Sequence, residues 1–253
     1  MIKKINESIQ AYHTRAEVSS SALKKIYKKS VWHWLNEPPM ETKSLTIGTN
    51  VHDILQDNTY LERKFIAFNG DLRTKKGKEE KAAIEKEHPG KIIIKQEELE
   101  MYQQIERNFW DHKTAHRYMD GHIELSHITN IDGIGVRVRP DCISREGKWI
   151  SDIKTCQDAE RRAFKRDARK YGYPLQAVFY SEVCNVPVRE FRFLAVETRP
   201  PYGVEVYVLD DDLIEEGGKA LKEAWQFYKL YKEEGIITGL RGDRYNEKGE
   251  IYL

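Results

Sequence analysis

The spacing of apolar residues is helical in the first part of this chain and strand-like in its centre. Over residues 1–120, apolar side chains recur every three or four positions, the pattern of a helix with one buried face. This pattern predicts helices over about 19–34, 44–55 and 96–118. The dipeptide Pro38-Pro39 ends the first of them. The lysine-rich stretch from Arg73 to His88 predicts an exposed helix or a mobile insertion.

Alternating and β-branched residues become frequent from Ile123 onward and predict a sheet. Strands are expected over 123–129, 134–144, 149–155, 188–196 and 204–209. Helical spacing is expected over 161–170, 173–184 and about 213–234. This order of elements predicts an α/β fold in which a central mixed sheet is flanked by helices.

We expect a single domain, because no linker, internal repeat or low-complexity tract divides the 253 residues. It comprises a helical part (about 1–120), a sheet core (about 121–210) and a C-terminal helix and tail (211–253). The composition, 40% hydrophobic and 33% charged, is that of a soluble globular protein. The chain shows neither a membrane-spanning apolar run nor an apolar signal segment, so we expect a cytosolic protein with no membrane partner.

The cysteines indicate no disulfide or metal site, and the net charge does not indicate which partners the protein binds. Cys142, Cys156 and Cys184 lack CxxC spacing, so we expect buried thiols rather than a disulfide framework or a zinc site. An iron–sulfur cluster, which needs four cysteine-type ligands, is not indicated either. The net charge of +1 does not show whether the protein binds DNA, because DNA binding depends on where the charges lie on the surface.

A hairpin is expected to join strands 134–144 and 149–155. Whether Glu146-Gly147 or all four residues from Arg145 to Lys148 form the loop, Asp141 lies directly opposite Asp152. Directly opposed residues have Cβ atoms roughly 4.5 to 5.5 Å apart, and like charges there are destabilising. A divalent cation bound by hard carboxylate oxygens would compensate. The alternative is a pair of solvated acids on an open sheet face.

Two further charged residues share this face of the sheet. Lys154 follows Asp152 by two positions, so its ammonium is expected near the metal. A type I′ turn at Asp132-Gly133 in the preceding hairpin would set Glu124 opposite Asp141. A turn one residue earlier would move Glu124 two positions along, still on the same face.

A cluster of basic residues follows the acid site. A helix over 161–170 would place all six on one side, where they could form a rail for DNA phosphates. The alternative is a solvated helix face, which is the commoner place for a run of charges. The six residues are Arg161, Arg162, Lys165, Arg166, Arg169 and Lys170.

These motifs resemble the PD-(D/E)XK nuclease superfamily. Its signature is similar to Pro140-Asp141, ten intervening residues and Asp152-Ile153-Lys154. Further pieces, in the same order along the chain, resemble the RecB-type branch of that superfamily, and the opening resembles phage and prophage RecE-type exonucleases (exodeoxyribonuclease VIII). The RecB-type pieces are Gly48-x-x-x-His52, Glu124 and Gln176-x-x-x-Tyr180, and the RecE-type opening is Tyr12-His13 followed by the segment Ser19–Lys24.

The resemblance implies a restriction-endonuclease-like core with a metal site. Asp141 and Asp152, with the backbone carbonyl of Ile153, would bind Mg²⁺, for which Mn²⁺ could substitute. His52 and Glu124 would complete or support the site. From the residues alone, a lone histidine on a helix such as His52 is more often structural.

The resemblance also implies roles around the reacting phosphate. Lys154 would orient or help deprotonate the attacking water and stabilise charge in the transition state. Gln176 and Tyr180 would position the phosphate or the catalytic side chains. A core role for Tyr180 is the alternative.

By the same resemblance, we expect a Mg²⁺-dependent exonuclease that degrades linear double-stranded DNA from 5′ to 3′ and releases 5′-phosphates. It would form a homo-oligomeric ring, leave 3′ single strands for a RecT-type annealing protein, and act in a bacterial or phage-infected cytosol. A Cas4-like or repair nuclease acting on single strands or flaps is one alternative; the missing cysteine quartet argues against the Cas4-like form. A DNA-binding module that no longer cleaves is another, against which the intact acids and Lys154 argue.

Overall fold

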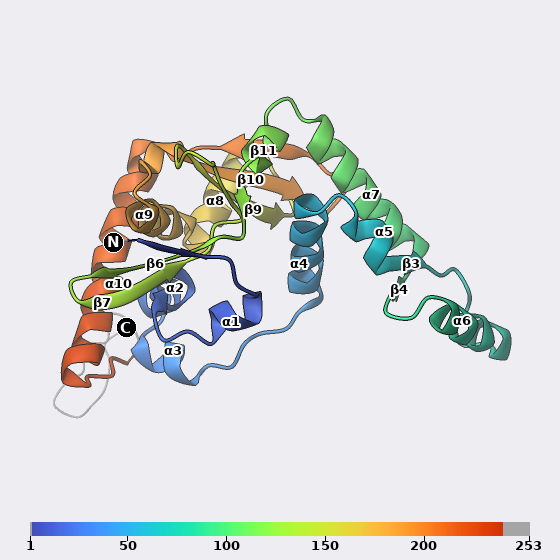
Figure 1. The fold of residues 1–253 in the computed structure, drawn as a ribbon, viewed down its shortest axis with the longest axis horizontal. Coiled ribbons are helices and arrows are strands. Elements are labelled where there is room, and N and C mark those ends of the chain that lie inside the picture. The colour runs from blue at the N-terminus through green and yellow to red at the C-terminus, as the bar shows by residue number, and fades with distance from the viewer. Residues whose placement is uncertain (1, 240–253) are drawn as a thin grey trace.

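The computed structural model describes residues 2–239, and a mixed five-stranded sheet lies at its centre (Figure 1). The strand order is β11-β10-β9-β8-β5; β9 and β10 run parallel and the other neighbours antiparallel. The expected α/β fold with helices around a mixed sheet is confirmed. The strands are β5 (His122–Ile123), β8 (Cys142–Ile143), β9 (Ile150–Cys156), β10 (Phe191–Glu197) and β11 (Val204–Tyr207).

A second sheet has four strands in the order β1-β6-β7-β2. Its strands β6 and β7 form the hairpin that precedes β8 along the chain. Its register pairs Ile131 with Ile134, and both Asp132 and Gly133 have positive φ, as the expected type I′ turn requires. The strands are β1 (Lys3–Ile5), β2 (Val18–Ser19), β6 (Ser126–Ile131) and β7 (Ile134–Val138).

The strand predicted over 134–144 is broken, and the break places Asp141 between the two sheets. Strand β7 ends at Val138 and β8 begins at Cys142. Pro140 in the gap has no backbone N–H and cannot continue a ladder. Opposite this gap, Glu124 lies between β5 and β6. Its φ of 53° departs from the extended conformation, so this strand is broken there too. Both strands therefore bend together from one sheet into the other.

Helices cover both faces of the central sheet (Figure 1). Alternation along β9 sends Ile153 into a core with α4 and α7, and Ile150 and Cys156 into a second core with α2, α9 and α10. Asp152 and Lys154 share the second face. The helices are α2 (Ser20–Lys28), α4 (Lys43–Gln56), α7 (Gln96–Asp111), α8 (Arg161–Tyr171), α9 (Tyr173–Cys184) and α10 (Asp211–Glu234).

The first predicted helix is divided in two, and the third ends earlier than expected. The first divides at Ser30, whose side chain caps α3 (Val31–Asn36) by accepting from the N–H of His33. The third ends at Asp111 and is followed by a 3₁₀ turn over Ala115–Met119. A second 3₁₀ turn, Val188–Glu190, precedes β10.

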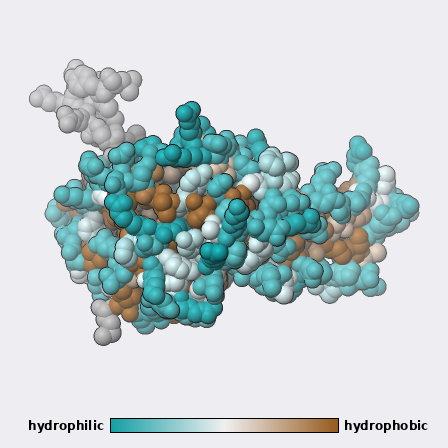
Figure 2. All heavy atoms as spheres, turned by 90° about the horizontal axis from the view of Figure 1, so that it is seen from above, coloured by the Kyte–Doolittle hydropathy of each residue, from teal (hydrophilic) through white to brown (hydrophobic). Residues whose placement is uncertain are grey.

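The segment 73–88 lies in an arm that extends away from the sheets (Figure 1). It forms α6 (Lys75–Glu87), beside a parallel strand pair that the sequence pattern did not predict. That pair is β3 (Phe65–Ala67) with β4 (Ile92–Ile94), and the remaining short helices are α1 (Ile9–His13) and α5 (Tyr60–Lys64). The face of the molecule seen in Figure 2 is mostly hydrophilic, with hydrophobic patches on the body and the arm.

One residue, Gly172, connects α8 to α9. Its φ is 70°, so it ends the first helix in the left-handed conformation and begins the second. A Cβ atom there would lie 3.2 Å from Cε of Lys28 and 3.4 Å from Cγ and Cδ of Lys24. Glycine therefore satisfies the backbone and also leaves room for two lysine stems.

Within residues 2–239, none of the helices is long and apolar enough to cross a membrane. All three cysteines are buried free thiols, as expected.

Candidate active site

The predicted hairpin register places the two aspartates opposite each other. Cys142 pairs with Ser151 and Ile143 with Ile150, so one further step along the strands sets Asp141 against Asp152. Both side chains are withdrawn from solvent, with 7% and 3% of their residue surface exposed. The alternative of two solvated acids on an open sheet face is thus excluded.

Asp141 is held by a backbone donor and by an imidazole. Its Oδ2 accepts a hydrogen bond from the N–H of Ile153 at 2.6 Å and lies 3.3 Å from Nδ1 of His52. Burial opposes ionisation of Asp141, yet the charge of His52 and these hydrogen bonds outweigh it and lower its pKa. In turn, although burial favours the neutral imidazole, the Asp141 carboxylate raises the pKa of His52.

Gly48 lets α4 pack closely enough on β9 for His52 to reach Asp141. A Cβ atom at Gly48 would lie 3.2 Å from Oγ1 of Thr155, closer than most side-chain contacts allow. Glycine therefore lets α4 lie directly on β9, and His52, one turn later, reaches Asp141. The Gly48-x-x-x-His52 spacing has a packing reason as well as a chemical one.

Asp152 is held by a lysine and an amide. Its Oδ1 forms an ion pair with Nζ of Lys154, and its Oδ2 accepts from Nε2 of Gln176 at 2.5 Å. Oδ1 is buried and receives no hydrogen bond of good geometry within residues 2–239. Burial raises the pKa of Asp152 despite the nearby Lys154 charge.

The donor set suits a hard divalent cation. The pKa values of the two opposed carboxyls shift in opposite directions, because burial dominates at Asp152, whereas at Asp141 the charge of His52 and the hydrogen bonds outweigh burial. The Oδ1 atom of Asp152 is buried and faces the Lys154 ammonium without a hydrogen bond of good geometry. Carboxylate oxygens are ligands that Mg²⁺ prefers. The carboxylates of Asp141 and Asp152 therefore have the donor chemistry that the expected ion needs.

Glu124 is brought to the site by its backbone but not by its side chain. Its N–H donates to the carbonyl of Asp141 at 3.1 Å, in line with the register predicted for a turn at Asp132-Gly133. The carboxylate instead contacts Nε of Arg139 and accepts from Nε2 of Gln56 at 3.4 Å. Within residues 2–239, no group of three or more His, Cys, Asp or Glu side chains is arranged to hold a metal ion. The ligand role of Glu124 stays a prediction without a supporting contact.

Gln176 and Tyr180 make different contacts: Gln176 binds Asp152, and Tyr180 packs in the core. Gln176 is buried and binds Asp152. The hydroxyl of Tyr180 donates to the carbonyl of Arg139 at 3.4 Å, and its ring packs edge-on against Phe191 in the core. Tyr180 therefore supports the backbone two residues before Asp141, and its packing matches the core alternative.

Lys24 is a site residue that the sequence analysis did not single out. Its Nζ donates to Oε1 of Gln176 at 2.9 Å. The only sequence signal was its place in the Ser19–Lys24 segment, next to the buried Leu23.

The basic residues occupy α8 in two adjacent rows, and their partners differ. In the first row, Lys165 pairs with Asp210 at 2.6 Å and Arg169 with Glu216 at 2.7 Å. The second row consists of Arg162, Arg166 and Lys170. Within residues 2–239, none of the second row forms an ion pair with an acid of another element.

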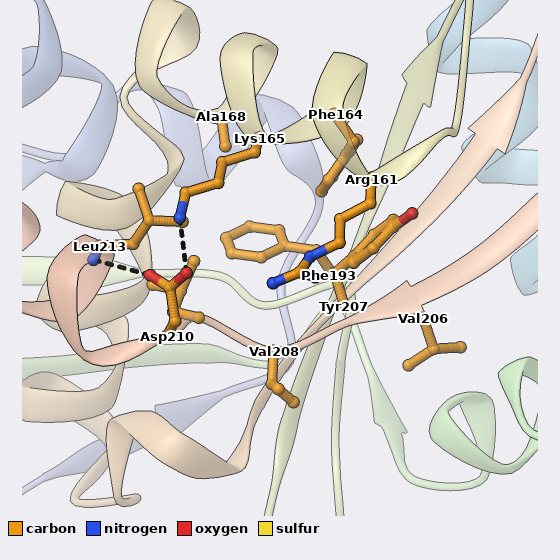
Figure 3. A pocket seen from close by; sticks show the side chains of 11 residues that line it. Arg161, Phe164, Lys165, Ala168, Phe193, Val206, Tyr207, Val208, Asp210 and Leu213 are labelled. Carbon is orange, nitrogen blue, oxygen red and sulfur yellow. Dashed lines mark hydrogen bonds and ion pairs between the residues drawn. The ribbon is translucent and has the colours of Figure 1, made fainter.

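Arg161 and Lys165, which share one side of α8, also line a cavity of about 300 Å³ between α8 and β11. Figure 3 shows Lys165 bonded to Asp210 at its edge, with Arg161 nearby. Stacked rings of Phe164 and Tyr207, 4.8 Å apart, form part of its wall. None of the residues around the two aspartates lines it.

A family model and solved structures are similar to this chain. A family model described as "PDDEXK-like domain of unknown function (DUF3799)" matches residues 19–236. A solved structure of a "Putative exonuclease" from Eubacterium rectale is similar to this chain, with a TM-score of 0.60, 15% identity, and 93% of this chain and 90% of that chain covered. A phage related exonuclease from Haemophilus somnus 129PT matches at a TM-score of 0.31 and 15% identity, over 90% of this chain and 100% of that chain. No curated protein matches the sequence.

Proposed function

This chain belongs to the PDDEXK-like domain family (DUF3799), and from that membership we propose that it is a Mg²⁺-dependent DNA exonuclease. The observation that carries the proposal is the pair of opposed, buried aspartates, one held by His52 and the other by Lys154 and Gln176. The solved structure with a TM-score of 0.60 supports the fold alone.

The reaction we propose is hydrolysis of a phosphodiester by in-line attack of water. When bound by Asp141, Asp152 and the Ile153 carbonyl, Mg²⁺ supplies positive charge at the scissile phosphate and activates water. His52 and the N–H of Ile153 fix the direction of the Asp141 carboxylate.

Lys154 is placed to act on the reacting groups. Its Nζ lies beside Asp152 and 4.9 Å from the centroid of the Tyr173 ring, so the ammonium is held from two sides. In that position it can orient the attacking water and stabilise negative charge developing on the phosphate oxygens. Gln176 keeps Asp152 aligned through its amide N–H.

The substrate and partners we propose follow from the resemblance to RecE-type exonucleases. The protein would digest linear duplex DNA from 5′ to 3′, with the second row of α8 along the backbone, and leave a 3′ strand for a RecT-type annealing protein. A homo-oligomeric ring would hold the DNA by topology, so a short basic row would suffice. Processivity that resists moderate salt, together with a closed oligomer by mass, would support the ring; a processive monomer would contradict it.

The proposal is tested by digestion of end-labelled linear duplex DNA beside a closed circle. Reactions contain Mg²⁺ or EDTA and either the wild-type protein or Asp152→Asn. We expect Mg²⁺-dependent release from 5′ ends alone, absent on the circle and in the variant. Cutting of the circle would indicate an endonuclease. Binding without cleavage in Mg²⁺ and Mn²⁺ would indicate a DNA-binding module.

A further inference from the structure

Lys24 reaches the active site from α2 along a path that Gly172 leaves open. A Cβ atom at Gly172 would lie 3.4 Å from both Cγ and Cδ of Lys24, so the lysine stem runs directly past this glycine. Beyond it, Nζ meets Oε1 of Gln176 at 2.9 Å. The two residues are 152 positions apart in sequence, and the packing of α2 on α9 brings them together.

The chemistry of both neighbours fixes the orientation of the Gln176 amide. A side-chain amide has an acceptor oxygen and a donor nitrogen, and a 180° turn about its last bond exchanges them. A lysine ammonium only donates, and an ionised carboxylate only accepts. With protonated Lys24 on one side and ionised Asp152 on the other, one orientation satisfies both contacts. In the turned orientation, two donors would face each other and two acceptors would face each other.

We propose that Lys24 is a positioning residue of the active site, which holds Gln176 with its N–H toward Asp152 and thereby aligns the Asp152 carboxylate. The inference rests on the proposed nuclease function for its effect on rate. The alignment itself is a property of the folded chain and exists without substrate.

The electrostatic setting supports a role that goes beyond filling space. Burial, followed by the like charge of Lys154, lowers the pKa of Lys24 to about 7. A lysine kept in such a place costs stability, so packing alone would favour an apolar residue of similar length. Lys25, the next residue on the same helix, instead binds Glu37 and takes no part in the site.

The first test reads the amide directly by NMR, without any activity. The side-chain ¹⁵N–¹H signals of Gln176 are assigned by their loss in Gln176→Leu. We expect Lys24→Met to shift these signals, Lys24→Arg, which keeps a charged donor, to leave them near their wild-type positions, and Lys25→Met to leave them unchanged. Signals unmoved in Lys24→Met would overturn the proposal. If Lys24→Met does not fold, Lys24→Gln replaces it as the neutral variant under the same criteria.

The second test measures kinetics with duplex DNA. We expect Lys24→Met to lower kcat roughly ten- to a hundredfold, the range for losing a charged hydrogen bond at a reacting site, with little change in KM. The double variant with Gln176→Leu should be no slower than Gln176→Leu alone, because both changes remove one alignment. Multiplying losses would show that Lys24 acts independently of Gln176, and would overturn the proposal. A wild-type protein inert in Mg²⁺ would reject the nuclease function, while the NMR signals would still decide the role of Lys24.

Discussion

The Oδ2 atom of Asp141 accepts a hydrogen bond from the backbone N–H of Ile153, across the hairpin that joins β8 to β9, at 2.6 Å. Because a backbone donor cannot rotate away, the carboxylate keeps its direction even when the imidazole of His52 moves. The same hairpin sets Asp152 opposite Asp141, so one local turn positions both acids.

Replacing Asp152 by asparagine should abolish cleavage and preserve the fold. The amide is nearly isosteric, but it removes the charge that would bind the metal. We expect no detectable digestion of linear duplex and an unchanged circular dichroism spectrum. Asp212→Asn, at an exposed acid in the first turn of α10, is the matched control and should digest DNA normally. Normal activity in Asp152→Asn would reject the site.

Lys154→Met should slow the chemical step far more than it weakens DNA binding. Preorganised charges at a transition state are typically worth about 10²–10³ in kcat. Single-turnover rates and binding in Ca²⁺, measured separately, distinguish the two effects. Lys148→Met, at an exposed lysine in the turn of the same hairpin, should alter neither. Equal losses in rate and affinity would make Lys154 a binding residue.

The two rows of α8 should differ in their contribution to DNA binding. Arg162→Gln with Arg166→Gln should weaken binding to all sequences and reduce the salt slope by about one per lost phosphate contact. Lys165→Gln with Arg169→Gln removes the same charge, but from side chains already paired with Asp210 and Glu216. We expect a clearly smaller change in that slope. Equal slopes in the two variants would mean that net charge alone matters.

Glu124→Gln tests whether the third acid binds metal. Its carboxylate contacts Arg139, so we expect a loss of Mn²⁺ affinity of roughly 10–100-fold at most, the range for a residue that supports ligands. Asp141→Asn should lose more. Isothermal titration calorimetry gives both affinities. A loss in Glu124→Gln as large as in Asp141→Asn would show that the glutamate turns from Arg139 to the metal.

Lys24→Met should become more stable relative to the wild-type protein as the pH falls. The folded pKa of about 7 lies below the ordinary 10.5, so between these values the unfolded chain binds more protons and wild-type stability rises with pH. The slope is at most about 1.4 kcal/mol per pH unit for one proton. Urea unfolding in EDTA at pH 7 and pH 9.5 measures the difference between the two proteins. Parallel pH dependence would contradict it.

The sequence predicted the parts of the site that local rules determine. Alternation places Lys154 on the face of Asp152, and the turn residues fix the register of both hairpins. The break at Pro140 was readable in principle, because proline cannot extend a ladder, yet β-branched neighbours suggested one continuous strand.

Contacts between distant elements could not be predicted in this way. The pairing of Glu124 with Arg139 depends on how two strands bend together, and that of Arg169 with Glu216 on where α10 packs. Lys24 meets Gln176 only because α2 lies against α9. Helical spacing gives the faces of these helices but not their partners.

A single residue joins the helix of the proposed DNA-binding rows to the helix of a proposed active-site residue. Gly172 joins the helix with the basic rows to the helix that carries Gln176, with no loop to absorb movement. The backbone phosphates that α8 would contact therefore stand at a fixed spacing from the bond that Asp152 would cut. The distance along the strand between the phosphates bound by α8 and the cleaved bond would then be the same in every cleavage step.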